Sequence, residues 1–228
     1  MNESPDYVDL THLLDDNVQI YPGDPKYSCC PALTISNDGL NVQTISMGSH
    51  TGTHVDAPYH FFEDGIRVDE LPISTFVARV LVVDLTSKQA KERISWADLA
   101  QVEDEMRRLA STKEGVALLL RTGWSRHWGS PTYFDHPFLE RDAAEKIIQA
   151  GVRILGVDTL SPDETRTDGS TPDFGVHEIV LGAGAVIAEN LNGLEVVCEG
   201  EWVVYLVPLK LAGGDGSPVR AFASRVRS

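Results

Sequence analysis

Three histidines and an aspartate lie within one short segment, residues 50–60, which reads HTGTHVDAPYH. Imidazole nitrogens and carboxylate oxygens are the ligands that zinc and manganese accept, and a site with three protein ligands leaves a position open for water. A single histidine is usually an ordinary polar side chain, but this many ligand-type residues around one glycine favour a metal site. The segment therefore predicts a divalent-metal centre.

The ligand-type side chains can converge only if this segment bends. They sit at even offsets, so a straight strand would place them on one face, but its rise of ~3.3 Å per residue leaves His50 about 13 Å from His54. A helix would align these two residues but turn Asp56 away, and Pro58 would end it. Because a bend costs least at glycine, we expect a strand-to-loop crossing that bends at Gly52.

Short apolar runs alternate irregularly with helical segments along the rest of the chain. The runs predict strands at 7–11, 40–47, 79–85, 116–121, 152–157, 185–188 and 203–209, with partly buried side chains on both faces of 40–47. Helices are expected to begin at the N-cap Ser95 and to span 142–150, ending at Gly151. Residues 161–173 read as a loop. The pattern predicts one α/β domain over residues 1–228 with a mixed sheet, and two domains are the alternative.

Composition excludes several classes of function. The chain has 228 residues, 42% hydrophobic and 23% charged, as in an ordinary folded domain. With 19 basic and 34 acidic residues its formal charge is −15, which disfavours binding to nucleic acid or to an anionic membrane. The polar N-terminus and the lack of a long apolar run predict a cytoplasmic protein. The three cysteines, Cys29, Cys30 and Cys198, are expected to be small buried thiols.

The 50–60 segment resembles the signature HxGTHxDxPxH of the cyclase family of metal-dependent hydrolases, which includes bacterial kynurenine formamidase and isatin hydrolase. The resemblance extends over nearly the whole chain, through DLT at 9–11, YPGD at 21–24, GVDTLS at 156–161, LVPLK at 206–210 and SPVRA at 217–221. It implies a swivelling β/β/α architecture and a homodimer or homotetramer.

The resemblance also implies a set of metal ligands for one or two divalent ions, with Zn²⁺ favoured and Mn²⁺ the alternative. These ligands are His50, His54, Asp56, His177 and Glu189. Glu189 also follows the apolar run 185–188, as an acid at the end of a buried strand would. In the family the last histidine of the signature, here His60, transfers a proton and does not bind the metal. An imidazole suits this role, because its ordinary pKa is near 6.5.

This site predicts hydrolysis of an amide C–N bond by metal-activated water, in an aryl formamide such as N-formylkynurenine or a cyclic amide such as isatin. In kynurenine formamidases a tryptophan that contacts the aryl ring precedes the Pro-Gly-Asp turn, and here Tyr21 takes its place. The aromatic segment 124–138 is a further candidate wall for the pocket. Residues that could support the ligands from behind are Arg121, Asp158 and Asp163. His127 and His136 receive no role.

Two other classes of function use the same residues. A non-haem Fe(II) oxygenase would need only His54, Asp56 and His177 as ligands. A metal-binding protein without catalysis would have no use for His60. Serine-hydrolase and dinucleotide-binding chemistry are excluded, because the chain has no GxSxG and residues 182–187 lack the third small residue of a dinucleotide loop.

Overall fold

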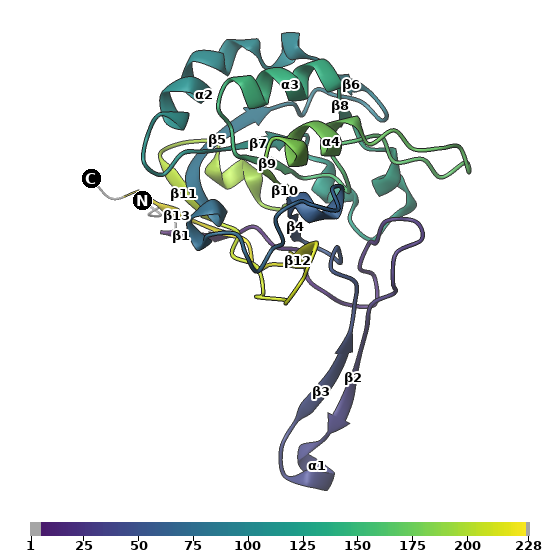
Figure 1. The fold of residues 1–228 in the computed structure, drawn as a ribbon. Helices are drawn as coiled ribbons and strands as arrows, with labels where there is room; N and C mark the ends of the chain where they lie inside the picture. Colours follow the sequence, from purple (N-terminus) through teal and green to yellow (C-terminus); the bar gives the residue numbers. More distant parts are fainter. Residues whose placement is uncertain (1–5, 227–228) are drawn as a thin grey trace, which may run out of the picture.

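The computed structural model describes residues 6–226 and has a large, curled β-sheet at its centre (Figure 1). In spatial order its strands are β1 (Tyr7–Asp9), β13 (Phe222–Arg225), β11 (Trp202–Tyr205), β5 (Val77–Asp84), β7 (Val116–Arg121), β9 (Ile154–Val157), β10 (Val186–Glu189), β4 (His54–Asp56) and β12 (Gly216–Pro218). The central strands β5, β7, β9 and β10 are parallel, and the outer strands pair antiparallel. The predicted α/β class with a mixed sheet is confirmed.

Helices cover one face of the parallel strands (Figure 1). They are α2 (Glu103–Ala110), α3 (Arg141–Gln149) and α4 (Gly175–Gly182). The short strands β6 (Arg93–Ile94) and β8 (Phe138–Leu139) form a separate parallel pair. The described residues also contain 3-10 turns, which are η1 (Pro58–His60), η2 (Ile73–Phe76), η3 (Trp96–Asp98), η4 (Ala100–Val102), η5 (Trp124–His127), η6 (Pro131–Asp135) and η7 (Leu194–Val197). No helix within residues 6–226 is long and apolar enough to cross a bilayer.

Strand β7 separates two hydrophobic cores. Its side chains alternate in direction, so Leu118 and Leu120 pack under the helices while Ala117 and Leu119 pack on the opposite side. There Leu119 belongs to the same cluster as Val55 of β4, because the sheet curls and brings its outer strands over this face. Burial on both faces explains why the strand reads as a continuous apolar run.

The prediction of a helix beginning at Ser95 is wrong in its geometry. Ser95 and Asp98 do form a capping box, but the turn that follows is the 3-10 turn η3, and α2 begins only at Glu103. The reason lies at Leu99, which is fully buried and has φ −115°, outside the α-helical range. The strand at 116–121 and the helix at 142–150 are confirmed within one residue.

A long hairpin projects from the body of the molecule (Figure 1). It consists of β2 (Ser28–Leu33) and β3 (Val42–Ser46), joined by the single-turn helix α1 (Ile35–Asp38), and we call residues 27–48 the arm. The expectation of buried faces at 40–47 is wrong, because every residue of β3 is exposed. The prediction of buried thiols also fails: Cys29, on the arm, is only partly buried, and Cys30 and Cys198 are exposed.

Candidate metal centre

The chain bends at Gly52, as the sequence predicts. Gly52 has φ +68°, and a Cβ there would lie 2.4 Å from Leu14 Cδ2, so only glycine fits this position without strain. Two side chains hold its carbonyl oxygen: His54 Nδ1 donates to it at 2.8 Å and Asn190 Nδ2 at 2.9 Å. Because Nδ1 is used in this way, His54 presents Nε2 to the interior.

The sheet register brings the distant carboxylate to the same point. Strand β10 pairs antiparallel with β4 so that Glu189 lies opposite His54. Helix α4 contributes His177, and all three residues are at least 94% buried. His54 Nε2 lies 3.3 Å from Asp56 Oδ1 and from Glu189 Oε2, and His177 Nε2 lies 3.3 Å from Glu189 Oε1. Asp56, buried to 99%, stands at the centre.

His50 approaches Asp56 from the other side of the bend. Its Nδ1 lies 2.7 Å from Asp56 Oδ1. The five predicted ligands therefore form two overlapping groups that could each hold a metal ion, His50 with His54 and Asp56, and Asp56 with His177 and Glu189. Asp56 belongs to both groups, so one ion or two would share its carboxylate.

Of the three predicted supporting residues, only Asp163 contacts a ligand. Its Oδ2 accepts from His177 Nδ1 at 2.6 Å, which directs His177 Nε2 toward Asp56 and Glu189. Its carboxylate also accepts from the backbone N–H groups of Val176 and His177, at the start of α4. The other two predicted supports act elsewhere. Asp158 accepts from Thr122 and Gly123, and Arg121 pairs with Asp84.

The electrostatics of the site call for a cation. Burial alone would lower the pKa of His54, but Asp56 and Glu189 outweigh burial and raise that pKa to about 10. Burial likewise opposes the charged form of His50, whose pKa Asp56 and Asp215 nonetheless raise to about 9. The buried carboxylates thus need positive charge beside them, which either protonated imidazoles or a divalent ion among neutral imidazoles would supply.

Unpaired polar atoms show that the residues fit a metal ion. Among residues 6–226, the buried atoms without a hydrogen-bond partner include His54 Nε2, Asp56 Oδ2 and Glu189 Oε1. Unpartnered polar atoms are rare in a folded interior because each costs about 1–3 kcal/mol. Here they belong to three neighbouring side chains, and the two oxygens lie 3.6 Å and 3.3 Å from His177 Nε2. Their chemistry, two kinds of hard or borderline donor, matches zinc or manganese.

A cavity of about 470 Å³ opens onto this cluster. Tyr21 lines it, as predicted, together with Phe61 and Phe174. The ring centroid of Phe174 lies 6.0 Å from that of Tyr21 and 5.4 Å from that of Phe61. No residue of the segment 124–138 lines the cavity. Its rings Trp124 and Tyr133 are buried with Leu160, in a cluster against which Tyr21 packs. The sequence analysis missed Phe174, although it stands three positions before His177.

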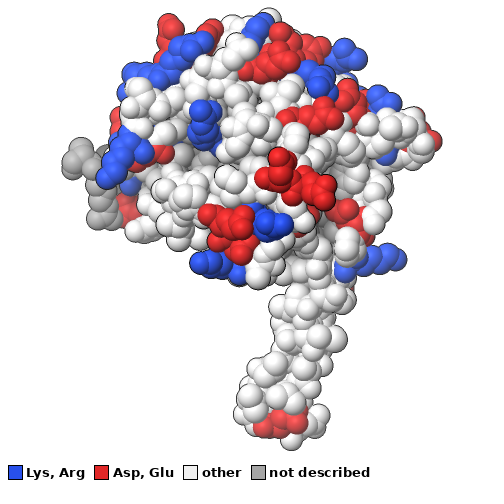
Figure 2. Space-filling model, in the orientation of Figure 1, with Lys and Arg blue, Asp and Glu red and all other residues white. Residues whose placement is uncertain are grey.

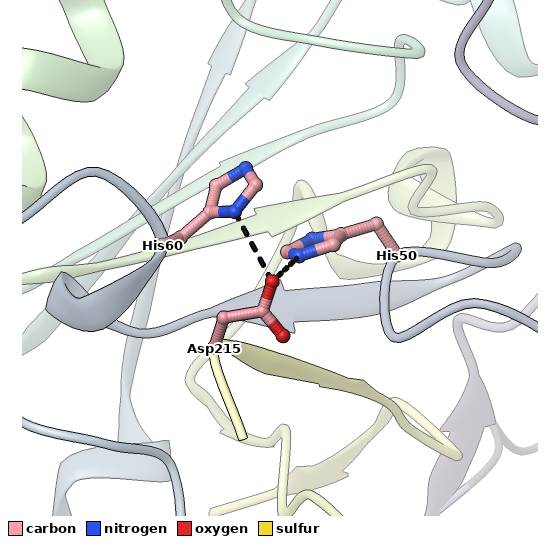
Figure 3. Close-up of side chains that lie close together, drawn as sticks. All are labelled: His50, His60 and Asp215. Carbon is pink, nitrogen blue, oxygen red and sulfur yellow. Dashed lines mark hydrogen bonds and ion pairs between the residues drawn. The ribbon is translucent and has the colours of Figure 1, made fainter. Parts of the chain in front are cut away.

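One acidic residue without a predicted role, Asp215, contacts two histidines of the site but does not itself line the cavity. Asp215 Oδ2 lies 2.9 Å from His50 Nε2 and 3.4 Å from His60 Nδ1, so that both rings point at this carboxylate (Figure 3). His60 ends the turn η1, and its side chain is about 28% exposed, more than that of any of the five predicted ligands. The only sequence signal for Asp215 is that it stands two residues before the segment 217–221, where the resemblance ends.

The two histidines without a predicted role lie outside the cavity lining. His136 is buried, donates from Nδ1 to the Pro137 carbonyl and contacts Thr165 Oγ1 through Nε2, so both ring nitrogens serve the fold. His127 accepts from Arg126 Nε at 3.2 Å on the surface. Neither residue belongs to the groups that could hold a metal ion.

His12, whose backbone N–H donates to Thr53 Oγ1 beside the bend, is expected to make the stability of the fold depend on pH. It is 93% buried and stacked on Trp128 at 4.1 Å, and burial lowers its pKa to about 4 from an ordinary value of 6.5. Between these values the unfolded chain binds the proton that the folded chain refuses. His12 therefore costs no stability above pH 6.5. As the pH drops to 4, protonation of His12 in the unfolded chain lowers the free energy of unfolding by about 3 kcal/mol.

Replacing His12 with phenylalanine keeps an aromatic ring against Trp128 and removes the group that binds the proton. We expect denaturant unfolding of His12→Phe to lose less stability than the native chain between pH 7 and pH 4.5. Equal losses in the two proteins would contradict the assignment.

The fold and site define a protein with a buried His/carboxylate metal centre, and comparison with known sequences identifies the family. Residues 8–164 match the family model described as putative cyclase, and the chain belongs to the cyclase family. It is 32% identical over 222 residues to the kynurenine formamidase of Bacillus cytotoxicus, an alignment that covers 96% of this chain and 97% of the relative.

Solved structures agree with this assignment. Isatin hydrolase A from Labrenzia aggregata, bound to benzyl benzoate, superposes with a TM-score of 0.83 at 28% identity and covers 97% of this chain and 94% of its own. A predicted metal-dependent hydrolase from Bacillus stearothermophilus gives 0.73 at 26% identity, over 95% of this chain and 97% of its own. The relatives thus match the chain over nearly its full length, including the part beyond residue 164.

Proposed function

We propose that this chain is a metal-dependent hydrolase that cleaves an amide C–N bond. The observation that carries the proposal is the cluster of buried atoms without hydrogen-bond partners on His54, Asp56 and Glu189, three neighbouring residues that line an open cavity. Similarity over nearly the whole chain to kynurenine formamidases and isatin hydrolases supports the reaction class.

The proposed ligands are the five residues of the two overlapping groups, His50, His54, Asp56, His177 and Glu189. They would hold one or two ions, with Zn²⁺ favoured over Mn²⁺ because imidazole and carboxylate donors suit both and zinc binds more tightly to a given site. When bound, such an ion lowers the pKa of water toward ~7 and stabilises negative charge on a carbonyl oxygen.

The chain's own contribution to the reaction is proton transfer and orientation. Overall, water adds across the C–N bond: its oxygen joins the carbonyl carbon, the C–N bond breaks, and the nitrogen gains a proton. His60 lines the cavity and lies 3.4 Å from Asp215 through Nδ1, so its Nε2 is the atom that would take a proton from the attacking water and return it to the leaving nitrogen.

The proposed substrate is an aromatic amide of small size, either an aryl formamide or a cyclic amide fused to a ring. The cavity volume suits a molecule of one or two rings. Tyr21, Phe61 and Phe174 line it with aromatic faces on which an aryl ring can stack. A cytoplasmic location remains a prediction of the sequence.

Elemental analysis combined with a substrate screen tests the proposal. Purified protein should contain about one or two equivalents of a divalent metal and should hydrolyse members of a panel of formanilides and isatins, with loss of activity on chelation. A metal-free protein that is inactive with every added divalent ion would refute it. Consumption of oxygen with Fe(II) and 2-oxoglutarate would instead favour the oxygenase that uses His54, Asp56 and His177.

We also propose that the chain is a homo-oligomer whose copies associate through the arm. Within residues 27–48 Asp38 is the single charged residue, and Figure 2 shows the arm almost free of charged groups except at its tip. Apolar side chains on it are exposed, namely Leu33, Ile35, Leu40, Val42 and Ile45. An isolated two-stranded hairpin is at best marginally stable in water, so the arm needs a packing partner. With a charge of −15 per chain, an uncharged segment is where two copies can approach without repulsion.

A charge on the arm should therefore separate the copies. We expect Ile45→Lys, at a position that is 54% exposed, to sediment as a monomer or as a rapidly dissociating species while keeping its fold. The matched control is Ile73→Lys, which places the same charge at a 69% exposed site on the body. A native chain that is monomeric at micromolar concentration, or equal sedimentation of both variants, would contradict the proposal.

A further inference from the structure

Asp215 lies between two residues of the proposed machinery. Its carboxylate oxygen Oδ2 lies 2.9 Å from Nε2 of the proposed ligand His50 and 3.4 Å from Nδ1 of the proposed proton carrier His60 (Figure 3). The two imidazole rings face each other with centroids 3.9 Å apart at an angle of 32°. One oxygen atom therefore contacts both rings.

The backbone around Asp215 is built to hold it there. Its carbonyl oxygen accepts from the Ala57 N–H at 2.9 Å, directly beyond the pairing of Gly216 with Asp56 at the β12–β4 edge. A Cβ on Gly216 would lie 2.6 Å from the Val55 carbonyl oxygen and 2.7 Å from His50 Cε1, so the glycine permits the ring to lie against the strand. The sheet thus fixes the backbone of Asp215, while its side chain, 37% exposed, contacts both imidazole rings.

The contact determines which nitrogen of each ring is free. With Nε2 of His50 facing Asp215, Nδ1 remains for the centre, where it lies 2.7 Å from Asp56. With Nδ1 of His60 facing Asp215, Nε2 remains for the cavity. A carboxylate that accepts from the outer nitrogen of a ligating imidazole is the usual means of fixing its ring and tautomer, and His177 has the same arrangement with Asp163.

We propose that Asp215 is a positioning residue for the reaction: it fixes the rings of His50 and His60 together and so couples metal binding to proton transfer. The inference rests on the proposed function, because it assumes those two roles. It differs from the role of Asp163, which contacts only one proposed ligand. Loss of Asp215 should therefore weaken both metal binding and proton transfer. Loss of Asp163 should weaken metal binding alone.

The first test is metal affinity, measured by competition with a chromogenic chelator on the full-length protein. We expect Asp215→Ala to weaken binding of Zn²⁺ about 10–100-fold through His50. Asp69→Asn is the matched control, because Asp69 Oδ1 accepts from the Gly213 N–H on the same loop but does not line the cavity. Thermal unfolding of both variants checks that the fold is kept.

The second test uses the leaving group, at saturating metal. An anilide nitrogen must receive a proton to leave, whereas the phenolate of 4-nitrophenyl formate leaves without one. We expect Asp215→Ala to lower kcat about 10–100-fold for a formanilide and less for the ester. In a His60→Ala background the same substitution should have little further effect on the anilide, because the two residues act as a unit.

These outcomes separate the inference from the proposed function. Equal metal affinity and equal anilide-to-ester ratios in Asp215→Ala and Asp69→Asn would overturn the role of Asp215. A native protein that binds metal but hydrolyses no formanilide and no isatin would overturn the proposed function. In that case the chelator competition alone would decide whether Asp215 positions His50.

Discussion

Alanine in place of His60 is expected to lower turnover about 10²–10⁴-fold while the content of bound metal stays at the native level. The expectation follows from the position of the ring. His60 belongs to neither of the two inner groups, those of the proposed ligands, but to a third group that could hold an ion, with His50 and Asp215, and it lies partly exposed at the cavity wall. Removing the ring takes away a proton carrier and leaves the buried carboxylates and the proposed ligands in place.

Steady-state kinetics on a formanilide, together with elemental analysis of the same preparation, measure both quantities. His127→Ala is the matched control, because His127 contacts Arg126 at the surface and does not line the cavity, and its turnover should equal that of the native chain. If His60→Ala loses its metal along with its activity, the residue is a ligand and the division of roles at this site is wrong.

The second large effect is expected at Asp56, where asparagine should abolish metal binding. Asp56 is the one residue shared by both inner groups, and it lies next to His50 and His54. Asparagine keeps the shape of the side chain but removes the charge that attracts the cation. Since loss of a supporting residue already weakens a site about 10–100-fold, loss of this ligand should weaken it by more than about 100-fold.

Three proteins give a graded test. In chelator competition the native chain should bind metal most tightly. Asp163→Asn should bind it about 10–100-fold more weakly, and binding by Asp56→Asn should fall below detection. Added Zn²⁺ should raise the Tm of the native chain and not that of Asp56→Asn, since a ligand stabilises only the state that binds it. Retention of metal by Asp56→Asn would show that the centre lies elsewhere.

Local chemistry made part of the site predictable. The bend at Gly52 could be predicted because a left-handed backbone between two threonines favours glycine, and φ is indeed +68°. The buried strand β7 could be predicted because a strand covered on both faces needs an unbroken apolar run. Both features depend on residues that are neighbours in the chain.

The remaining parts depend on pairings between distant segments. Glu189 meets His54 through the β4–β10 register, and Asp215 meets His50 because β12 pairs with β4. Asp163 could be named as a possible support but not matched to His177, and nothing in the residues near Asp215 indicates its contacts. His177 and Glu189 could be named in advance only through the resemblance to a family. The arm escaped prediction because β3 alternates like a half-buried strand although both of its faces are exposed.

The position of β4 in the sheet has a consequence for how the protein is made. This strand, which carries His54 and Asp56, lies between β10 and β12, whose residues come near the end of the sequence. During synthesis on the ribosome β4 emerges early and has no neighbouring strand until residues 186–218 have followed. The proposed ligand set can therefore assemble only after residues 177–218 have been made, and a product that ends before residue 177 would carry the whole 50–60 signature without His177 and Glu189.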